Sequence, residues 1–193
     1  DRGRCRPEYE QSILDDLDWL GLLPDRPSTA DFRRGALPQR QSDNVARYSQ
    51  RLLELEARGL AYPCICSRGD IERAWASAWE RENDGIPLLE GVEMRYTGTC
   101  RALQHDPRAT AARRIIMDAD DPIQFEDLRT GRQVQEPSRQ CGDLLARDRN
   151  GNYTYQLCVT VDDHDQDVTL VIRGEDLLES TGHVPWRHMA DHY

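Results

Sequence analysis

Two segments near the start of the chain have the apolar periodicity of amphipathic helices. The first covers residues 7–20 and ends at Gly21, with an apolar stripe formed by Ile13, Leu14, Leu17 and Leu20. The second is expected to begin with Ser42 as its cap and to close at Gly59, with one apolar face formed by Val45, Tyr48, Leu52 and Leu55. Both stripes indicate core packing. Residues 24–38, which contain prolines and a glycine, are predicted to form a loop between the two helices.

The middle of the chain predicts one more helix and several short strands. Ser67 and Asp70 have the spacing of a capping box, so a third helix is expected to start there, with Trp75 and Trp79 on one face. Short apolar runs predict strands at 60–66, 115–117 and 123–125. Polar, turn-rich residues predict loops at 83–91 and 126–142.

The last third of the chain has a different pattern. Residues 153–161 are rich in β-branched and aromatic side chains, and 168–172 form a short apolar run suited to a buried strand. A helix is expected from Glu175. This order is similar to a strand-turn-strand-turn-helix piece of an α/β sheet, where ligands bind beyond the carboxyl ends of strands. The polar residues that would occupy that position are Asp162, Asp163, Arg173 and Glu175.

The composition limits the class of protein. The chain has 193 residues and a net charge of −10, and all 25 of its basic residues are arginine, which excludes any mechanism based on a lysine of this chain. Its length predicts one domain, or one with an insertion. It has no run approaching the ~20 apolar residues of a membrane helix and no visible signal peptide, so no membrane association is expected.

The six cysteines are an even number, which permits three disulfides. Disulfide scaffolds are usually short and secreted, so this chain fits the cytoplasm better. Cys64 and Cys66 flank one residue and suit two bonds to a single metal ion, with Cys100 as a third ligand. Zinc prefers four ligands in a tetrahedron, and the fourth is either Tyr96 as a phenolate or His105. Such a closed site would be structural. The alternative is three buried thiols that never meet.

A basic stretch adjoins the predicted metal loop. Between residues 95 and 117 five arginines stand against one acid, Asp106, although the chain as a whole is acidic. Arginine clusters suit phosphate backbones, which predicts contact with nucleic acid. The alternative is a solvated surface. The residues predicted to make this contact are Arg101, Arg108, Arg113 and Arg114.

Several segments together resemble the glutamyl-type class I aminoacyl-tRNA synthetases. Residues 1–17 resemble the segment after the first catalytic strand of that family, and 155–157, 161–164 and 171–178 resemble its later core. The likeness covers most of residues 1–181. The Cys-x-Cys pair with the Tyr-x-Gly-x-Cys-Arg motif at 96–101 is most similar to the short branch of the family, the glutamyl-queuosine tRNA(Asp) synthetases.

The resemblance implies a fold, a set of ligands and a reaction. The fold would be a partial Rossmann-like class I catalytic core of the α/β class, with a zinc-bearing acceptor-binding-type insertion. Cys64, Cys66, Tyr96 and Cys100 would bind Zn²⁺, and Tyr155 and Arg173 would contact glutamate. The substrates would be glutamate, ATP with Mg²⁺, and tRNA(Asp), whose queuosine base receives the glutamate. No residue of this chain is expected to act as a catalytic nucleophile or acid.

The chain also departs from the family pattern. Neither ATP motif of the family, the His-x-Gly-His type or the lysine-containing one, occurs in it, so it is expected to be inactive alone and to be the central fragment of a monomeric enzyme. The expected domain parts are 1–60 and 143–193 from the core and 61–142 as the zinc-bearing insertion. Residues 182–193 do not match the family's continuation. The alternatives are a fragment of an ordinary glutamyl-tRNA synthetase charging tRNA(Glu), and a catalytically dead zinc-stabilised RNA-binding module.

Overall fold

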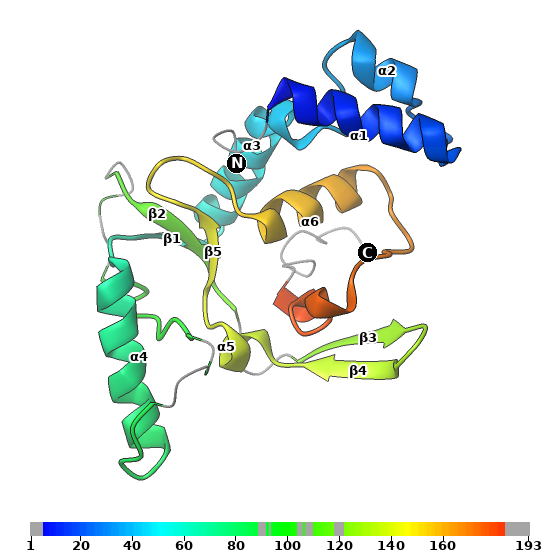
Figure 1. Cartoon of the computed structure of the whole chain (residues 1–193). Helices are drawn as coiled ribbons and strands as arrows, with labels where there is room; N and C mark the ends of the chain where they lie inside the picture. The colour runs from blue at the N-terminus through cyan, green and yellow to red at the C-terminus, as the bar shows by residue number, and fades with distance from the viewer. Residues whose placement is uncertain are drawn as a thin grey trace. The chain divides into compact units, whose positions relative to one another are not determined.

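The computed structural model describes residues 6–88, 92, 94–103, 106, 110–117 and 122–183 (Figure 1). The chain divides into two compact units, Asp1–Gln50 and Arg51–Tyr193. His105, Arg108, Cys5 and most of the segment 182–193 lie outside the described residues, so the predictions that fall on them remain predictions. No helix in the described ranges is long and apolar enough to cross a membrane.

The first unit is helical. Helix α1 (Pro7–Leu20) has the predicted bounds, with proline in its first turn and Gly21 in the left-handed conformation that closes it. The predicted loop 24–38 is wrong in part, because it contains helix α2 (Thr29–Arg34). Ser28 and Asp31 form a capping box there: the Asp31 amide donates to Ser28 Oγ (3.2 Å) and the Ser28 amide to Asp31 Oδ2 (2.9 Å).

Helix α3 (Val45–Ala57) begins in the first unit and continues into the second. Ser42 does not cap it, because Ser42 lies inside a short 3-10 helix, η1 (Gln41–Asp43). The end of α3 agrees with the prediction. The amide of Gly59 donates to the Glu56 carbonyl and that of Leu60 to the Leu55 carbonyl, which is the hydrogen-bond pattern of a Schellman motif.

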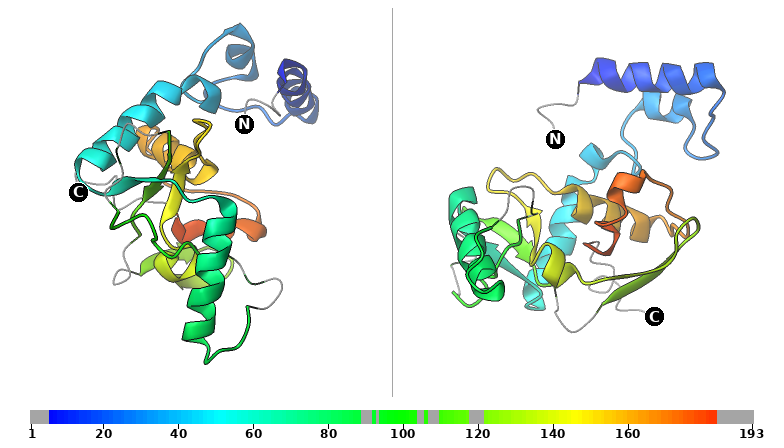
Figure 2. Two further views of the ribbon diagram at one scale, coloured as in Figure 1. Left: turned by 90° about the vertical axis from the view of Figure 1, so that its left-hand side faces the viewer. Right: turned by 60° about the horizontal axis from the view of Figure 1, so that its bottom comes forward.

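A three-stranded antiparallel sheet organises the second unit, with the strand order β1 (Ala61–Cys64), β2 (Ala112–Ile115) and β5 (Leu144–Arg147). Pro63 is tolerated in β1 because β1 is an edge strand. Helices α4 (Arg68–Glu82) and α6 (Tyr155–Asp165) lie to either side of this sheet (Figures 1 and 2). The strand predicted at 115–117 lies at 112–115, so it starts three residues and ends two residues earlier than expected.

A separate hairpin pairs β3 (Ile123–Asp127) with β4 (Gly131–Gln135). It occupies part of the segment predicted as a polar loop, and α5 (Pro137–Gln140) follows it. The turn is held by Asp127, whose Oδ1 accepts hydrogen bonds from the amides of Arg129 (3.0 Å) and Thr130 (2.7 Å). A polar sequence forms a strand here because local turn chemistry sets the register.

The prediction for the last third of the chain is wrong. Residues 155–165 form helix α6 instead of a strand, and no strand occurs at 168–172, where Ile172 is 89% exposed. A 3-10 helix, η2 (Glu175–Leu177), takes the place of the expected helix from Glu175. The α6 residues that are buried recur at helical spacing, Leu157 with Val161 and Cys158 with Asp162, so packing overrides their β-propensity. Asp162 and Asp163 therefore lie on a helix, not beyond a strand end.

Candidate functional site

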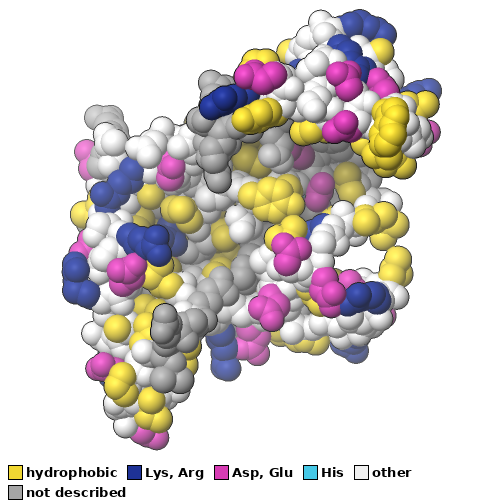
Figure 3. Space-filling view, in the orientation of Figure 1, with side chains coloured by type: hydrophobic (Ala, Val, Ile, Leu, Met, Phe, Trp, Pro, Cys, Tyr) yellow, Lys and Arg dark blue, Asp and Glu magenta, His cyan; other side chains and the backbone are white. Residues whose placement is uncertain are grey.

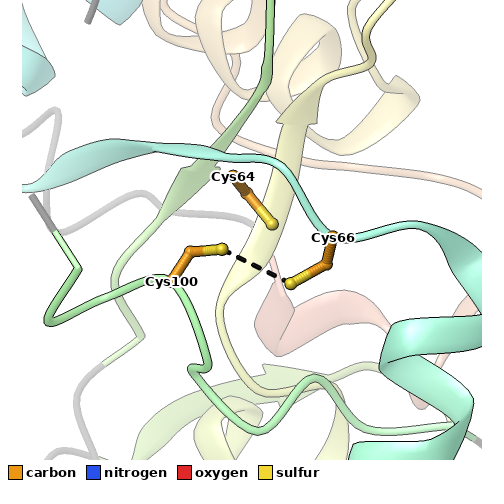
Figure 4. Close-up of side chains that lie close together, drawn as sticks. All are labelled: Cys64, Cys66 and Cys100. Carbon is orange, nitrogen blue, oxygen red and sulfur yellow. Dashed lines mark hydrogen bonds between the residues drawn. The ribbon is translucent and has the colours of Figure 1, made fainter. Parts of the chain in front are cut away.

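Three cysteine thiols from two distant segments meet beside the first strand of the sheet. Cys64 ends β1, Cys66 lies in the loop that leads to α4, and Cys100 comes from the loop 96–101 (Figure 4). Their sulfur atoms all lie within 4.8 Å of one another, and Cys66 Sγ is 3.4 Å from Cys100 Sγ. Cys64 and Cys100 are buried, and Cys66 is partly exposed. The spacing of the cysteines in the sequence predicted this meeting.

Tyr96 completes the group with a phenolic oxygen. Its hydroxyl lies 3.4 Å from Cys64 Sγ and 4.0 Å from Cys66 Sγ, and it accepts a hydrogen bond from the amide of Cys100 (2.9 Å). The backbone of Tyr96 is fixed as well, because its amide donates to the Cys141 carbonyl (3.0 Å) and it forms a parallel bridge with Gly142. The loop is thereby attached to the segment that leads into β5.

This group of donors fits a tetrahedral metal ion. A zinc ion with sulfur ligands at ~2.3 Å has sulfur atoms roughly 3.8 Å apart, and here Cys66 Sγ and Cys100 Sγ are 3.4 Å apart with all three sulfur atoms within 4.8 Å. Three thiols and one phenol use all four positions, so no coordination site would remain for a substrate. Such an ion would be structural, and it would fix the loop 96–101 to the end of β1.

The surroundings act on the thiols in opposite directions. Burial opposes ionisation of Cys64, but hydrogen bonds from Tyr96 and the backbone of Cys66, together with the Arg114 guanidinium, hold the pKa of this thiol below its usual value. Burial, followed by the neighbouring Cys100 and Cys64, raises the pKa of Cys66 to about 12. Burial also raises the pKa of the Tyr96 hydroxyl. The environment thus favours the ionised form at Cys64 and opposes it at Cys66, and a bound metal ion would hold its cysteine ligands as thiolates.

Asp143 holds the segments behind this cluster together. It is 5% exposed, and its carboxylate accepts hydrogen bonds from the Tyr62 hydroxyl (2.6 Å) and the Met117 amide (3.0 Å). Arg101 lies 3.4 Å from the same carboxylate, and the Asp143 carbonyl accepts from Arg114 (2.7 Å). The sequence gives no sign of this role, because an aspartate in a turn-rich segment carries no signal of burial.

The arginines predicted to contact nucleic acid differ in their exposure to solvent. Arg113 and Arg114 are each 7% exposed, which leaves little of either side chain accessible, and their contact with a phosphate backbone stays a prediction. Arg113 pairs with Glu56 (2.5 Å), and the Arg114 guanidinium lies 3.7 Å from the centre of the Tyr96 ring. Arg101 keeps 44% of its side chain exposed. Acidic and basic side chains are interspersed over the face drawn in Figure 3.

The two residues predicted to contact glutamate are both accessible to solvent. Tyr155 is the first residue of α6 and is 49% exposed. Arg173 is partly exposed in the irregular segment before η2. Burial raises the pKa of the Asp163 carboxyl, and the charge of Arg173 opposes that shift, so Arg173 is close enough to Asp163 to act on it. The roles of both residues towards glutamate stay predictions.

Comparison with known proteins gives a consistent group of relatives. The family model described as tRNA synthetases class I (E and Q), catalytic domain, matches residues 1–188. Proteins named glutamyl-Q tRNA(Asp) synthetase from Cupriavidus metallidurans and Burkholderia mallei are 36% and 35% identical over 182 residues, covering 94% of this chain and 53% and 55% of their own lengths. The chain thus spans about half the length of these relatives.

Solved structures agree at the level of the fold. A glutamate tRNA ligase from Elizabethkingia meningosepticum, in complex with its amino acid, superposes with a TM-score of 0.70 at 23% identity, covering 95% of this chain and 37% of that one. The glutamate-tRNA synthetase of Elizabethkingia anophelis gives a TM-score of 0.66 at the same identity, covering 94% and 37%. The mixed α/β architecture described above is therefore that of a class I synthetase catalytic domain. The chain belongs to the family of class I glutamyl and glutaminyl tRNA synthetases.

Proposed function

We propose that this chain is part of an enzyme that activates glutamate with ATP and transfers it to the queuosine base of tRNA(Asp). The observation that carries the proposal is the cluster of Cys64, Cys66, Cys100 and Tyr96, assembled by the motif that resembles this branch of the family. Relatives with the name of that activity, 35–36% identical over 94% of the chain, support it. We place the enzyme in the cytoplasm as a monomer, with a Rossmann-like core and residues 61–142 as the insertion that faces the tRNA.

The reaction needs two transfers and no nucleophilic side chain. The α-carboxylate of glutamate attacks the α-phosphate of ATP, which forms glutamyl-adenylate and releases pyrophosphate. A hydroxyl of the modified base then attacks the activated carbonyl, which forms an ester and releases AMP. Positioning and stabilisation of charge supply most of the rate in such a reaction. Magnesium is the expected companion of ATP.

Tyr155 and Arg173 are the proposed contacts of glutamate in this chain. A guanidinium can pair with a carboxylate through two parallel hydrogen bonds, and a tyrosine hydroxyl adds another bond and a wall. Their partial exposure leaves both side chains accessible to a small molecule. Zn²⁺ is the proposed occupant of the cysteine cluster, where it would add cross-links between β1 and the loop 96–101.

The test of the reaction compares acceptors. The 193-residue chain and the protein encoded by the uninterrupted reading frame around it are assayed for glutamate-dependent ATP–pyrophosphate exchange and for transfer of labelled glutamate. Transfer to tRNA(Asp) that contains queuosine, with none to the same tRNA without it, is expected from the complete reading frame. Charging of tRNA(Glu) would favour an ordinary glutamyl-tRNA synthetase. The solved structures with a similar fold carry names of that kind. Exchange with neither tRNA charged would contradict the proposed acceptor.

The metal has a test of its own. Purified protein is expected to contain about one zinc per chain. Cys100→Ser should lower that content and loosen the loop, because it removes one of the three clustered thiols. Cys158→Ser is the matched control, since Cys158 is equally a buried cysteine but lies in α6, outside the cluster. Equal zinc content in both variants would remove Cys100 from the site.

A further inference from the structure

A cavity of about 300 Å³ lies next to the cysteine cluster, between α4, the loop 95–101 and residues 138–143. Three arginines from different parts of the chain line it: Arg81 from α4, and Arg95 and Arg101 from the loop. Its two acidic lining residues are Glu82 and Asp143. The three arginines outnumber these two acids, so the lining carries one positive charge in excess.

Both carboxylates accept hydrogen bonds from neighbouring groups of the protein. Glu82 accepts a hydrogen bond from Arg95 (2.6 Å), whose guanidinium also lies 4.6 Å from the centre of the Trp75 ring. The Asp143 carboxylate accepts hydrogen bonds from the Tyr62 hydroxyl and the Met117 amide. Arg95 therefore forms a fixed side of the cavity, since an ion pair and a cation–π contact both hold it.

The other two arginines keep donors for a ligand. Arg81 uses only its Nε, which donates to the Ser77 carbonyl (3.1 Å), and within the described ranges its two terminal nitrogens have no protein partner. Arg101 has one long contact, 3.4 Å to Asp143, and is 44% exposed. A guanidinium carries five N–H donors, so most donors of both side chains have no acceptor among the described residues.

Two hydroxyl groups add to this set. Ser138 lines the cavity, and its Oγ is buried without a hydrogen-bond partner among the described residues. A buried hydroxyl without a partner costs free energy, which is recovered when a ligand supplies an acceptor. Thr97 supplies a second hydroxyl in the lining. Several donors around one small volume match a group that only accepts hydrogen bonds and carries negative charge, which describes a phosphate.

The loop that carries the candidate metal ligands also forms the cavity. Tyr96 belongs to both sites, and Thr97, Gly98 and Arg101 of the same loop are lining residues. Arg101 directly follows Cys100 in the chain. Fixing the loop at the cluster therefore fixes the position of the Arg101 guanidinium relative to Arg81 on α4.

We infer that this cavity binds a phosphate group of the RNA substrate through Arg81, Arg101 and Ser138. The inference rests on the proposed function for the identity of the RNA, and on the cavity for the site. It transfers the predicted nucleic-acid contact from the buried Arg113 and Arg114 to a site that α4 and the loop build together. Arg81 lies outside the basic stretch between residues 95 and 117.

The test measures binding of a tRNA(Asp) transcript to the 193-residue chain by fluorescence anisotropy between about 50 and 200 mM salt. Arg81→Ala and Arg101→Ala should each weaken binding roughly three- to tenfold and lower the slope of log affinity against log salt by about 1. Ser138→Ala should weaken binding without changing the slope, because it removes a donor but no charge. Arg68→Ala is the matched control on the same helix: Arg68 is 85% exposed and is not a lining residue, so affinity and slope should stay as in wild type.

Far-UV circular dichroism and melting curves establish that each variant is folded. Wild-type affinity and slope in both Arg81→Ala and Arg101→Ala would overturn the cavity while leaving the RNA function intact. Absence of tRNA binding by the wild-type chain would overturn the cavity as an RNA site, whereas the transfer assay on the complete reading frame decides the proposed function. A parallel thermal-shift titration uses inorganic phosphate. If phosphate stabilises the wild type and not Arg81→Ala, while RNA affinity is equal in the two, the cavity takes free phosphate and the assignment to RNA is overturned.

Discussion

Gly142 is the residue at which two backbone segments of the site come closest together. It has a φ of 68° and forms a bridge with Tyr96, and a Cβ added at this position would overlap the Tyr96 carbonyl oxygen. Both the left-handed backbone and the close approach exclude other residues. The position of the Tyr96 hydroxyl among the thiols thus depends on a glycine that contributes no side chain to the site.

Gly142→Ala is expected to lower the free energy of unfolding by roughly 2–4 kcal/mol, since backbone strain and a steric overlap add. Zinc content should fall as well, because Tyr96 must move. Gly151→Ala is the control: Gly151 has a φ of 87° but open space around its Cβ position, so it carries only the backbone cost of about 1 kcal/mol. Urea unfolding and metal analysis give both quantities. Equal losses in the two variants would show that the contact with Tyr96 is unimportant.

Arg173 is the residue through which the proposed glutamate site is tested. In the complete enzyme, Arg173→Ala should raise the KM for glutamate by roughly tenfold or more and leave the KM for ATP nearly unchanged, because the lost pair is made to a carboxylate of the amino acid. Arg173→Lys should recover only part of the loss, since an ammonium cannot form the bidentate pair. Steady-state pyrophosphate exchange measures both constants. An equal change in both would assign Arg173 a structural role beside Asp163.

Charge alone did not distinguish the arginines of the basic stretch. Arg101 and Arg114 differ little in sequence context, yet the first is exposed and the second is buried over the Tyr96 ring. Burial of an arginine requires partners from distant segments, here the carbonyl of Asp143, and no local pattern reports them. The cysteine cluster was predictable because the spacing of its ligands is itself the signal.

At the scale of elements, helices with strong end signals were predicted well. Pro7 and Gly21 delimit α1, and the capping box of Ser67 and Asp70 starts α4, as the sequence indicates. The same capping-box signal at Ser28 and Asp31 stands among prolines, which favour a loop, and it begins α2 nonetheless. Helix α6 resembles a strand in sequence because its two valines and Thr160 favour strands locally, while its burial repeats with the period of a helix.

The capping box of α4 makes a prediction that depends on pH. Hydrogen bonds from the side chain and then the amide of Ser67 lower the pKa of Asp70 below its usual 3.8. A carboxyl with a lowered pKa in the folded state stabilises the fold above its unfolded pKa, and this contribution is lost as pH falls through the folded pKa. Asp70→Asn should therefore be less stable than wild type at pH 7, and the difference should shrink below about pH 4.

Urea unfolding at pH 7, 5 and 3 checks this expectation. Glu72→Gln serves as the control on the same helix, because Glu72 is exposed and pairs only with Arg68 outside the capping box. It should change stability much less at every pH, as is usual for exposed pairs. A difference between Asp70→Asn and wild type that stays constant from pH 7 to pH 3 would show that the Asp70 charge does not stabilise the start of α4.

At the scale of the whole molecule, the family and the meeting of the three cysteines were predictable, and the sheet was not. The three strands of the sheet are antiparallel and come from 61–64, 112–115 and 144–147. The expected boundary between 142 and 143 falls just before β5, which pairs with β2 of the proposed insertion. Pairing between strands so distant in sequence depends on tertiary packing and leaves only weak local signals.

Removal of the metal should act on one compact unit and not on the other. The cluster links β1 to the loop 96–101, and β1 pairs with β2, so all three belong to the unit Arg51–Tyr193. In zinc-loaded protein, a chelator should raise amide hydrogen exchange in these segments by roughly tenfold or more, since their protection depends on local cross-links. Helix α1 contributes no ligand, and its exchange should not change.

Cys100→Ser should exchange rapidly in the same segments before any chelator is added, whereas Cys158→Ser should respond like wild type. Acceleration in α1 as large as in β1 would mean that the metal sustains both units together, and no acceleration anywhere would mean that the thiols hold no metal.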